Sequence, residues 1–190
     1  MPSITEERIL DAARRVLCVN AGATVDEIAA EAQVGRATVF RLFKSRAGLL
    51  RTLGRRAILV TDQVAAEAAA TAATATEALK AVITAVLGAS EHYRFLGTAV
   101  ELSEDEEITR AYDRQLSELA DLVAAARREG SIRPDLPTAW VVAVIDGQLW
   151  ATGAAVAKGA VGLLQAQELI WGTIMTGISA GKAIGYTNGE

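Results

Sequence analysis

The sequence predicts an all-α protein, and three observations support this fold class. Proline occurs only at positions 2, 134 and 137, so residues 3–133 lack the residue that most strongly breaks helices. Alanine, the best helix former, is abundant throughout. Apolar residues recur three and four positions apart, with no alternating β-branched run bounded by turns. The chain has 190 residues, 51% of them hydrophobic, which provides ample apolar surface for a packed core.

Three short helices are expected at the N-terminus, over residues 4–19, 24–31 and 35–42. Thr24 followed by Glu27 fits a capping box, in which the hydroxyl accepts a backbone N–H and the carboxylate reaches back. Gly35 can serve as the N-cap of the third helix. Because helices of about eight residues are marginal alone, these helices should pack as one compact unit.

Longer helices are expected in the rest of the chain, over residues 45–72, 75–90, 104–129, 137–158 and 163–180, with a shorter piece near 93–100. The clearest break is the segment Arg133-Pro134-Asp135-Leu136-Pro137, which separates an acidic helix from an apolar one. Pro137 is well placed at a first helical position. Lys158 and Gly159 place a cation and a permissive residue at the end of the apolar helix.

Charge is distributed unevenly along the chain, whose formal net charge is −4. Residues 1–60 hold ten basic and six acidic residues, whereas residues 61–190 hold nine and seventeen. Residues 33–60 carry seven basic residues and no acidic one, as expected where a small module faces a polyanion. On charge alone, a solvated helix face is an equal alternative.

The sequence lacks the residues that several kinds of catalytic or cofactor site require. Cys18 and His92 are the only residues of their kinds, so no disulfide and no clustered Cys/His site for a metal, haem or iron–sulfur cluster is expected. There is no glycine-rich phosphate loop and no nucleophile elbow. We therefore expect neither an enzyme nor a cofactor. An all-helical enzyme or small-molecule-binding protein without DNA binding is the alternative function, because a carboxylate-only site leaves no sequence signal.

One segment, 138–157, is long enough to span a bilayer and contains Asp146 as its only charge. A carboxylate near the middle of a span costs about 2.5–3.5 kcal/mol, which favours a buried helix in a protein outside the membrane. The charged residues Glu6, Glu7 and Arg8 follow the N-terminus directly, without the apolar region of a secretory signal. These features predict a cytoplasmic protein.

The second and third helices, joined through Ala32-Gln33-Val34-Gly35, suggest a helix-turn-helix. In that motif the second helix of the pair enters the major groove of DNA. Spacing would turn Val34, Val39 and Phe43 toward the core and leave outward Arg36, Ala37, Thr38, Phe40 and Arg41. Two arginines on one outer face can read guanine edges or hold phosphates. The alternative is an ordinary solvated helix.

Three segments, Ile9-Leu10-Asp11-Ala12-Ala13, Thr24 to Ala29 and Val34 to Leu50, resemble the DNA-binding domain of tetracycline-repressor (TetR) type transcriptional regulators. The resemblance implies a DNA-binding domain over residues 1–46 and a helical ligand-binding and dimerisation domain over residues 47–190. It implies a homodimeric repressor that binds an inverted-repeat operator on double-stranded DNA and is released by a small-molecule effector. The residues implied to contact DNA are Thr24, Arg36, Ala37, Thr38, Phe40, Arg41, Lys44 and Arg46.

The chain departs from this family at three positions. Phe40 stands where a Tyr is usual and Leu42 where a His is frequent, and neither replacement can donate a hydrogen bond to a phosphate. Gln33 stands where a turn glycine is common. Arg46 matches the usual Lys at the start of the fourth helix, where a cation and the helix N-terminus can hold a phosphate together. Lys44 offers a replacement contact.

A ligand pocket should be apolar with few polar groups. Aromatic and isolated polar residues in otherwise aliphatic helices are the candidates: His92, Tyr93, Phe95, Glu101, Tyr112, Gln148 and Trp150. For each of them an ordinary core or surface position is the alternative. Residues 101–107 hold five carboxylates, which would favour a cationic ligand or form a solvated helix start.

Two stripes of residues on the last two helices are candidates for a dimer interface. They are Val144, Gly147, Ala151 and Ala155 on one helix, and Ile170, Ile174 and Ile178 on the next. Two such stripes from each subunit would form a self-complementary patch about a two-fold axis. The alternative is a monomer in which both stripes pack internally.

Overall fold

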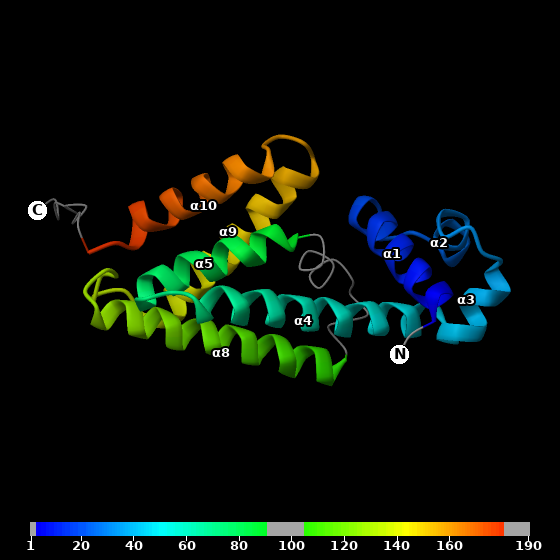
Figure 1. Ribbon diagram of the computed structural model, residues 1–190, viewed down its shortest axis with the longest axis horizontal. Helices are drawn as coiled ribbons and strands as arrows, with labels where there is room; N and C mark the ends of the chain where they lie inside the picture. The colour runs from blue at the N-terminus through cyan, green and yellow to red at the C-terminus, as the bar shows by residue number, and fades with distance from the viewer. Residues whose placement is uncertain (1–2, 91–104, 181–190) are drawn as a thin grey trace, which may run out of the picture.

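The computed structural model describes residues 3–90 and 105–180, and within these ranges the fold is built from helices (Figure 1). The N-terminal helices are α1 (Ile4–Val19), α2 (Val25–Glu31) and α3 (Arg36–Phe43). The remaining helices are α4 (Arg46–Ala70), α5 (Ala75–Gly88), α8 (Glu106–Arg128), α9 (Thr138–Ala157) and α10 (Leu163–Ile178). The all-α class is confirmed, and each of these helices ends within two residues of its predicted bounds. The expected piece at 93–100 lies outside the described residues.

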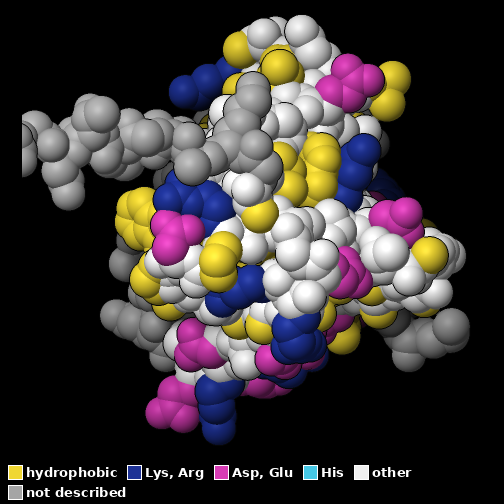
Figure 2. Space-filling model, turned by 90° about the vertical axis from the view of Figure 1, so that its left-hand side faces the viewer, with side chains coloured by type: hydrophobic (Ala, Val, Ile, Leu, Met, Phe, Trp, Pro, Cys, Tyr) yellow, Lys and Arg dark blue, Asp and Glu magenta, His cyan; other side chains and the backbone are white. Residues whose placement is uncertain are grey.

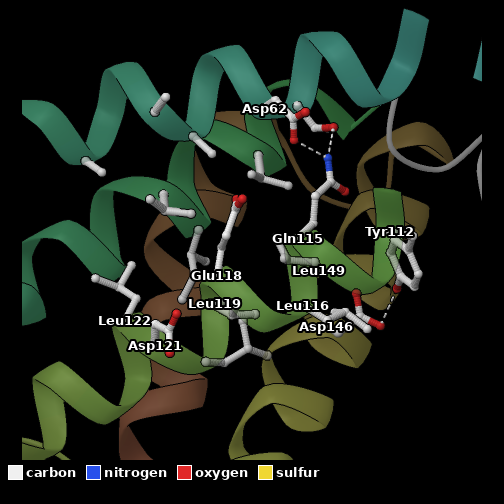
Figure 3. A pocket seen from close by; sticks show the side chains of 18 of the residues that line it. Asp62, Tyr112, Gln115, Leu116, Glu118, Leu119, Asp121, Leu122, Asp146 and Leu149 are labelled. Carbon is white, nitrogen blue, oxygen red and sulfur yellow. Dashed lines mark hydrogen bonds between the residues drawn. The ribbon is translucent and has the colours of Figure 1, made fainter. Parts of the chain in front are cut away.

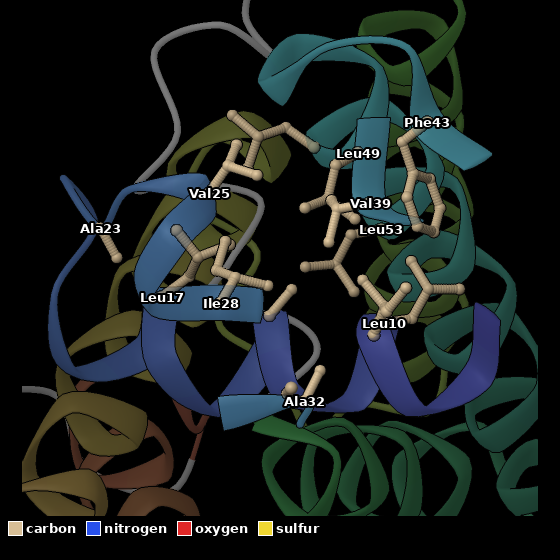
Figure 4. Close-up of a cluster of buried hydrophobic side chains, with 14 of the residues drawn as sticks. Leu10, Leu17, Ala23, Val25, Ile28, Ala32, Val39, Phe43, Leu49 and Leu53 are labelled. Carbon is tan, nitrogen blue, oxygen red and sulfur yellow. The ribbon is translucent and has the colours of Figure 1, made fainter. Parts of the chain in front are cut away.

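Helices α1, α2 and α3 form a compact unit at one end of the molecule, and α4 runs from this unit along the C-terminal helices (Figure 1). Buried side chains from all three helices meet in one cluster, including Leu10, Ile28 and Phe43 (Figure 4). The first half of α4 contributes Leu49 and Leu53 to the same cluster. The packing therefore continues across the predicted domain boundary at residue 46, because α4 belongs to both parts.

Local capping signals operate largely as the sequence indicates. Thr24 and Glu27 form the capping box at the start of α2, and Gly35 is the N-cap of α3. Gly159 follows the C-cap of α9 with φ +69°, a conformation that glycine adopts without steric cost. The expectation for Pro137 is wrong by one position: Pro137 is the N-cap, and α9 begins at Thr138.

The second core lies among α5, α8, α9 and α10. Its most buried side chains include Leu79, Ile83, Ile145 and Ile170. The end of α10 is tied to the segment after α8, where Ile132 and Ser179 form the only β-bridge among the described residues. Helix α4 lies along α5 and α8, and therefore joins this second core to the N-terminal unit (Figure 1).

Helix α9 is the one described helix whose length and apolar composition would allow it to cross a membrane. Only 28% of that stretch is buried inside the chain. The face of α9 that packs on the second core includes Val141, Ile145 and Leu149. Its outward face is also apolar, and among the described residues it leaves Trp140, Ala143 and Ala151 exposed.

Candidate functional site

The outward face of α3 carries the residues predicted to contact DNA. Arg36, Ala37 and Arg41 are exposed there, and Thr38 is half-buried. Phe40 is half-buried because its ring packs against the N-terminal core. Lys44, just beyond the helix, is exposed as well. The structure therefore brings two arginines and a lysine to one surface of the N-terminal unit.

Arg36 has a partner on the neighbouring helix. Its Nη1 lies 2.7 Å from Oδ2 of Asp26 in α2, and its guanidinium carbon lies 5.2 Å from the centre of the Phe40 ring. Both charged side chains are about 60% exposed. Exposed pairs of this kind contribute about 0–1 kcal/mol, so Arg36 can exchange Asp26 for a base edge or a phosphate at little cost.

Two other predicted DNA contacts have structural roles. Arg46 donates from Nε to the carbonyl of Ala23 (3.1 Å) and from Nη2 to that of Ala21 (2.8 Å), which ties the α1–α2 link to the start of α4. The Thr24 hydroxyl caps α2 and donates to the Glu27 carboxylate (2.8 Å). The backbone N–H and the hydroxyl of Thr24 both lower the pKa of Glu27. DNA contact by Arg46 and Thr24 stays a prediction.

The two corners that flank α3 use a backbone conformation that side chains disfavour. Gln33, in the turn before α3, has φ +51°, and Lys44, after it, has φ +67°. Residues other than glycine are uncommon in this left-handed region. The sequence position of Gln33, where the family usually has glycine, agrees with this turn. The orientation of α3 is therefore set by two tight corners and by the packing of Val39 and Phe43 in the core.

A cavity of about 470 Å³ lies among α4, α5, α8 and α9 (Figure 3). Most of its wall is aliphatic, as in Ala65, Val86, Leu119 and Leu149. Seven polar residues interrupt the wall: Thr61, Asp62, Tyr112, Gln115, Glu118, Asp121 and Asp146. This size and this composition are typical of a site for a small organic molecule.

Asp62 of α4 is the centre of a polar network beside the cavity. The Gln115 amide donates to Asp62 Oδ1 (2.7 Å) and to the hydroxyl of the buried Thr61 (3.0 Å), as the dashed lines in Figure 3 show. Arg114 Nη2 lies 2.6 Å from Asp62 Oδ2, and this hydrogen bond and the carboxylate charge raise the pKa of Arg114. These contacts join α8 to α4 at the wall of the cavity.

A second hydrogen bond joins α8 to α9. The Tyr112 hydroxyl donates to Asp146 Oδ2 over 2.9 Å, and both side chains are half-buried (Figure 3). Asp146 is the charge that interrupts the apolar segment 138–157. It therefore faces the cavity, where it meets a hydrogen-bond donor.

One of the seven residues predicted to bind a ligand lines this cavity. Tyr112 lines it, whereas Gln148 and Trp150 do not, and Trp150 packs against the second core. His92, Tyr93, Phe95 and Glu101 lie outside the described residues. The residues of α9 that line the cavity are Ile145, Asp146 and Leu149, so ligand contact by Gln148 and Trp150 stays a prediction.

Sequence reasoning missed Asp62, Gln115, Glu118 and Asp121. A usable signal existed on α8, where residues 112, 115, 116, 119 and 122 recur at three- and four-residue spacing and form one face. Polar residues on an otherwise apolar helix face are the feature that would have pointed to them. Asp62 offered no such signal, because only the packing of α8 against α4 brings it to the cavity.

Of the two stripes predicted for a dimer interface, the one on α9 lies at the surface and the one on α10 is buried. Gly147 and Ala151 are exposed on α9, and Val144 and Ala155 are half-buried beside them. The stripe on α10 was assigned wrongly: Ile170, Ile174 and Ile178 are at most 2% exposed, because they fill the second core of the same chain. The outward surface of α9 and α10 instead exposes Trp140 (59%), Leu164 (81%) and Leu169 (53%).

The end of the molecule farthest from the N-terminal unit has a different character. In Figure 2 basic, acidic and apolar side chains are interspersed on this face, and no region of one charge dominates it. An even mixture of charges gives little attraction for a polyanion. The basic segment 33–60, by contrast, includes α3 and the start of α4 at the opposite end (Figure 1).

Comparison with known proteins agrees with this geometry. The sequence profile of bacterial regulatory proteins of the tetR family matches residues 9–53, which span α1 to the first part of α4. The chain is 30% identical over 136 residues to the HTH-type transcriptional repressor LfrR of Mycolicibacterium smegmatis. That alignment covers 72% of this chain and 70% of LfrR.

Solved structures extend the likeness to nearly the whole chain. A structure of LfrR from Mycobacterium smegmatis in complex with proflavine has a TM-score of 0.74 and 27% identity, and covers 92% of this chain and 96% of LfrR. The ketosteroid regulator KstR2 of Mycobacterium tuberculosis has a TM-score of 0.74 at 20% identity, covering 94% and 97% of the two chains. The second likeness concerns the fold alone.

Proposed function

Because the chain belongs to the tetR family of bacterial regulatory proteins and is a DNA-binding transcriptional regulator, not an enzyme, we propose that it is a ligand-released repressor. It binds an inverted-repeat operator as a homodimer, and a small molecule in the cavity among α4, α5, α8 and α9 releases it. As a DNA-binding regulator it acts in the cytoplasm. The exposed α3 face with Arg36 and Arg41, held in a compact basic unit, is the observation that carries the proposal.

Binding to DNA is tested with single substitutions on and beyond α3. In the proposed complex Arg41 reads a base edge, so Arg41→Ala should cost about 1–3 kcal/mol on the operator and relax the preference at one base pair. Lys44 holds a phosphate, so Lys44→Ala should weaken binding to every duplex and reduce the salt slope by about 0.9. Fluorescence anisotropy on DNA upstream of the gene, against a scrambled duplex, measures both effects.

Arg128→Ala is the matched control, since Arg128 is an exposed arginine at the end of α8, far from α3. It should leave affinity unchanged. If Arg41→Ala weakens operator and scrambled DNA alike, Arg41 is a phosphate contact. Absence of operator binding by the unaltered protein would overturn the proposal.

The operator symmetry follows from the proposed dimer. The outward face of α9 and α10 contains the stripe around Gly147 and Ala151 and three large exposed apolar side chains. A second copy related by a two-fold axis would cover this face and also the apolar stretch of α9. One α3 per subunit then requires an inverted repeat, with half-sites one helical turn or a multiple apart. A footprint on a direct repeat contradicts this.

Helix α4 is the proposed link between cavity and DNA. At about 1.5 Å per residue its 25 residues extend about 37 Å. Near the middle of the helix Arg56 pairs with Glu7 of α1, and Arg55 pairs with Glu107 of α8 at 2.5 Å. One to two turns further, Asp62 lines the cavity. A ligand that shifts α8 against α4 would therefore move the N-terminal unit.

Linkage gives this mechanism a strict test. Operator DNA must weaken effector binding by the same factor by which the effector weakens operator binding, corresponding to about 1–3 kcal/mol. LfrR has been crystallised with proflavine, which makes this fluorescent compound a reasonable first probe here. Titrations with and without operator measure the factor. A compound that binds both forms equally tightly is not an effector.

A further inference from the structure

We propose that Asp26 of α2 and Arg36 of α3 read the operator as one unit, in which Asp26 orients Arg36 toward a guanine and opposes its use as a phosphate contact. This inference rests on the proposed function, because it names a specificity-determining residue for operator binding. It is based on the position of the Asp26 carboxylate, on a second support for the Arg36 guanidinium, and on the negative charge that Asp26 adds to the surface facing DNA.

Asp26 contacts the recognition helix from the neighbouring helix. It lies in the first turn of α2, two residues after the N-cap Thr24, and its Oδ2 accepts a hydrogen bond from Arg36 Nη1 over 2.7 Å. In a helix-turn-helix the first helix crosses the DNA backbone while the second enters the major groove. Because the carboxylate contacts an exposed residue of α3, it lies at the surface that meets DNA in the proposed complex.

The Phe40 ring supports the Arg36 guanidinium from a second direction. The guanidinium carbon lies 5.2 Å from the ring centre, within the range of a cation–π contact, and Phe40 is itself packed against the N-terminal core. An arginine that is ordered before binding loses less side-chain entropy when it binds a base. The two supports therefore favour one orientation of Arg36 before DNA arrives.

The ion pair leaves part of the guanidinium available for a base. Asp26 engages Nη1 of Arg36, so the edge formed by Nε and Nη2 can donate to another partner. That edge presents two parallel N–H groups, and the O6 and N7 atoms of guanine are the pair of acceptors that suits them. Arg36 can therefore bind a guanine while it keeps its contact with Asp26.

The Asp26 charge distinguishes a phosphate from a guanine. A phosphate beside Arg36 is repelled by the Asp26 carboxylate, whereas a guanine edge carries no net charge. Contacts with phosphates supply essentially all of the affinity for random DNA. Asp26 therefore weakens binding to random DNA more than binding to the operator, and repulsion of the wrong partner is a general source of specificity.

The variant Asp26→Asn tests the role of the charge, because asparagine keeps the shape of the side chain. Fluorescence anisotropy measures the affinity of the full-length protein for the operator and for a scrambled duplex, and circular dichroism checks the fold. Asp26→Asn should bind the scrambled duplex about three- to tenfold more tightly, and the ratio of operator to scrambled affinity should fall at least about fivefold. An unchanged ratio overturns the proposal.

The guanine is tested by replacing each guanine of a half-site, one at a time, with 7-deazaguanine, which lacks the N7 acceptor. One replacement should weaken binding of the unaltered protein at least about fivefold and leave binding of the Arg36→Ala variant unchanged. The same replacement should cost Asp26→Asn less, because Arg36 then contacts phosphate more readily. If no guanine shows this dependence on Arg36, the proposal is wrong.

Glu31→Gln is the matched control for Asp26→Asn. It removes one carboxylate from the other end of α2, where Glu31 pairs with Arg15 of α1 at 3.0 Å and both side chains are partly exposed. This variant should leave the ratio of operator to scrambled affinity unchanged. Equal loss of discrimination in both variants would be an effect of general surface charge and would overturn the role of Asp26.

The outcomes separate this inference from the proposed function. Operator binding with the same ratio in Asp26→Asn overturns the inference alone. Loss of discrimination by Asp26→Asn on a site that proves to be a direct repeat supports the inference and overturns the proposed operator symmetry. Absence of DNA binding by the unaltered protein overturns both.

Discussion

Gly48, in the first turn of α4, is packed against the backbone of Phe43 at the end of α3. A Cβ atom at this position would lie 2.1 Å from the Phe43 carbonyl oxygen, a distance that no side-chain motion can relieve. Gly48→Ala should therefore destabilise the N-terminal unit by about 1–3 kcal/mol or more, as overpacking does. Urea unfolding followed by circular dichroism measures the loss.

Gly88→Ala in α5 is the matched control. There the nearest atom to a new Cβ is the flexible end of Gln167 at 3.8 Å, so the change should be neutral or slightly stabilising. A Gly48→Ala variant as stable as the Gly88→Ala variant would contradict the packing at the corner between α3 and α4.

Glu129 joins the end of α8 to the start of α5. Its carboxylate accepts from the N–H of Ala75 (2.6 Å) and from the N–H and hydroxyl of Thr76. These donors, the Ala75 N–H foremost, lower the pKa of Glu129 below its usual 4.5. A lowered folded pKa stabilises the protein above the unfolded pKa, and this stabilisation is lost as pH falls through the folded value.

Glu129→Gln should consequently lower the melting temperature at neutral pH, and the difference from the unaltered protein should shrink as pH falls below about 4.5. Differential scanning calorimetry from pH 7 to pH 3 follows the trend. Glu168→Gln, at an exposed position of α10, provides the comparison and should show no such convergence. A constant difference across the range would show that the Glu129 charge does not act.

At the scale of whole elements, α4 connects the two cores. Its first half is buried against α1, α2 and α3, and its second half lies along α5 and α8. Arg56 pairs with Glu7 and lies 3.9 Å from Asp11, both on α1, which adds a charged tie to this apolar contact. The orientation of the N-terminal unit therefore depends on a partly exposed ion pair as well as on packing.

Arg56→Gln should loosen this tie without unfolding either core, because partly exposed pairs contribute about 1 kcal/mol or less. We expect faster hydrogen exchange in α1, unchanged exchange in α9 and α10, and a lower operator affinity because the N-terminal units of a dimer are less well oriented. Arg128→Gln serves as the control at an exposed position of α8. Unchanged exchange in α1 would rule out the tie.

In the proposed dimer, the apolar surface that meets a second copy is the exposed face of α9. Ala151 lies on the exposed face of α9, whereas Ile174 is 1% exposed in the second core. Ala151→Glu should place like charges across the two-fold axis and yield a folded monomer. Ile174→Glu should instead unfold the chain, because it buries an unpaired charge.

Sedimentation velocity and circular dichroism together distinguish these results. A dimer that persists in the Ala151→Glu variant would place the interface elsewhere. A folded monomer produced by Ile174→Glu would restore the earlier assignment of the Ile170, Ile174 and Ile178 stripe to the interface.

Sequence alone was enough to predict the helices, the N-caps of α2 and α3, and the helix-turn-helix. These features depend on residues within a few positions of one another, such as Thr24 with Glu27, or the apolar spacing that turns Val39 and Phe43 inward. The resemblance over residues 9–50 rests on the same local patterns. Local chemistry of this kind is independent of how distant helices pack.

The residues that line the cavity, and the face of α10 that is exposed, could be identified only from the tertiary structure. Asp62 and Gln115 are 53 positions apart and meet because α8 packs on α4. The isoleucine stripe of α10 has the spacing of any buried helix face, and this spacing is identical whether the burying partner is the same chain or a second copy. The spacing of apolar residues predicts that a helix face is buried. Only the packing of the folded chain shows which surface buries it.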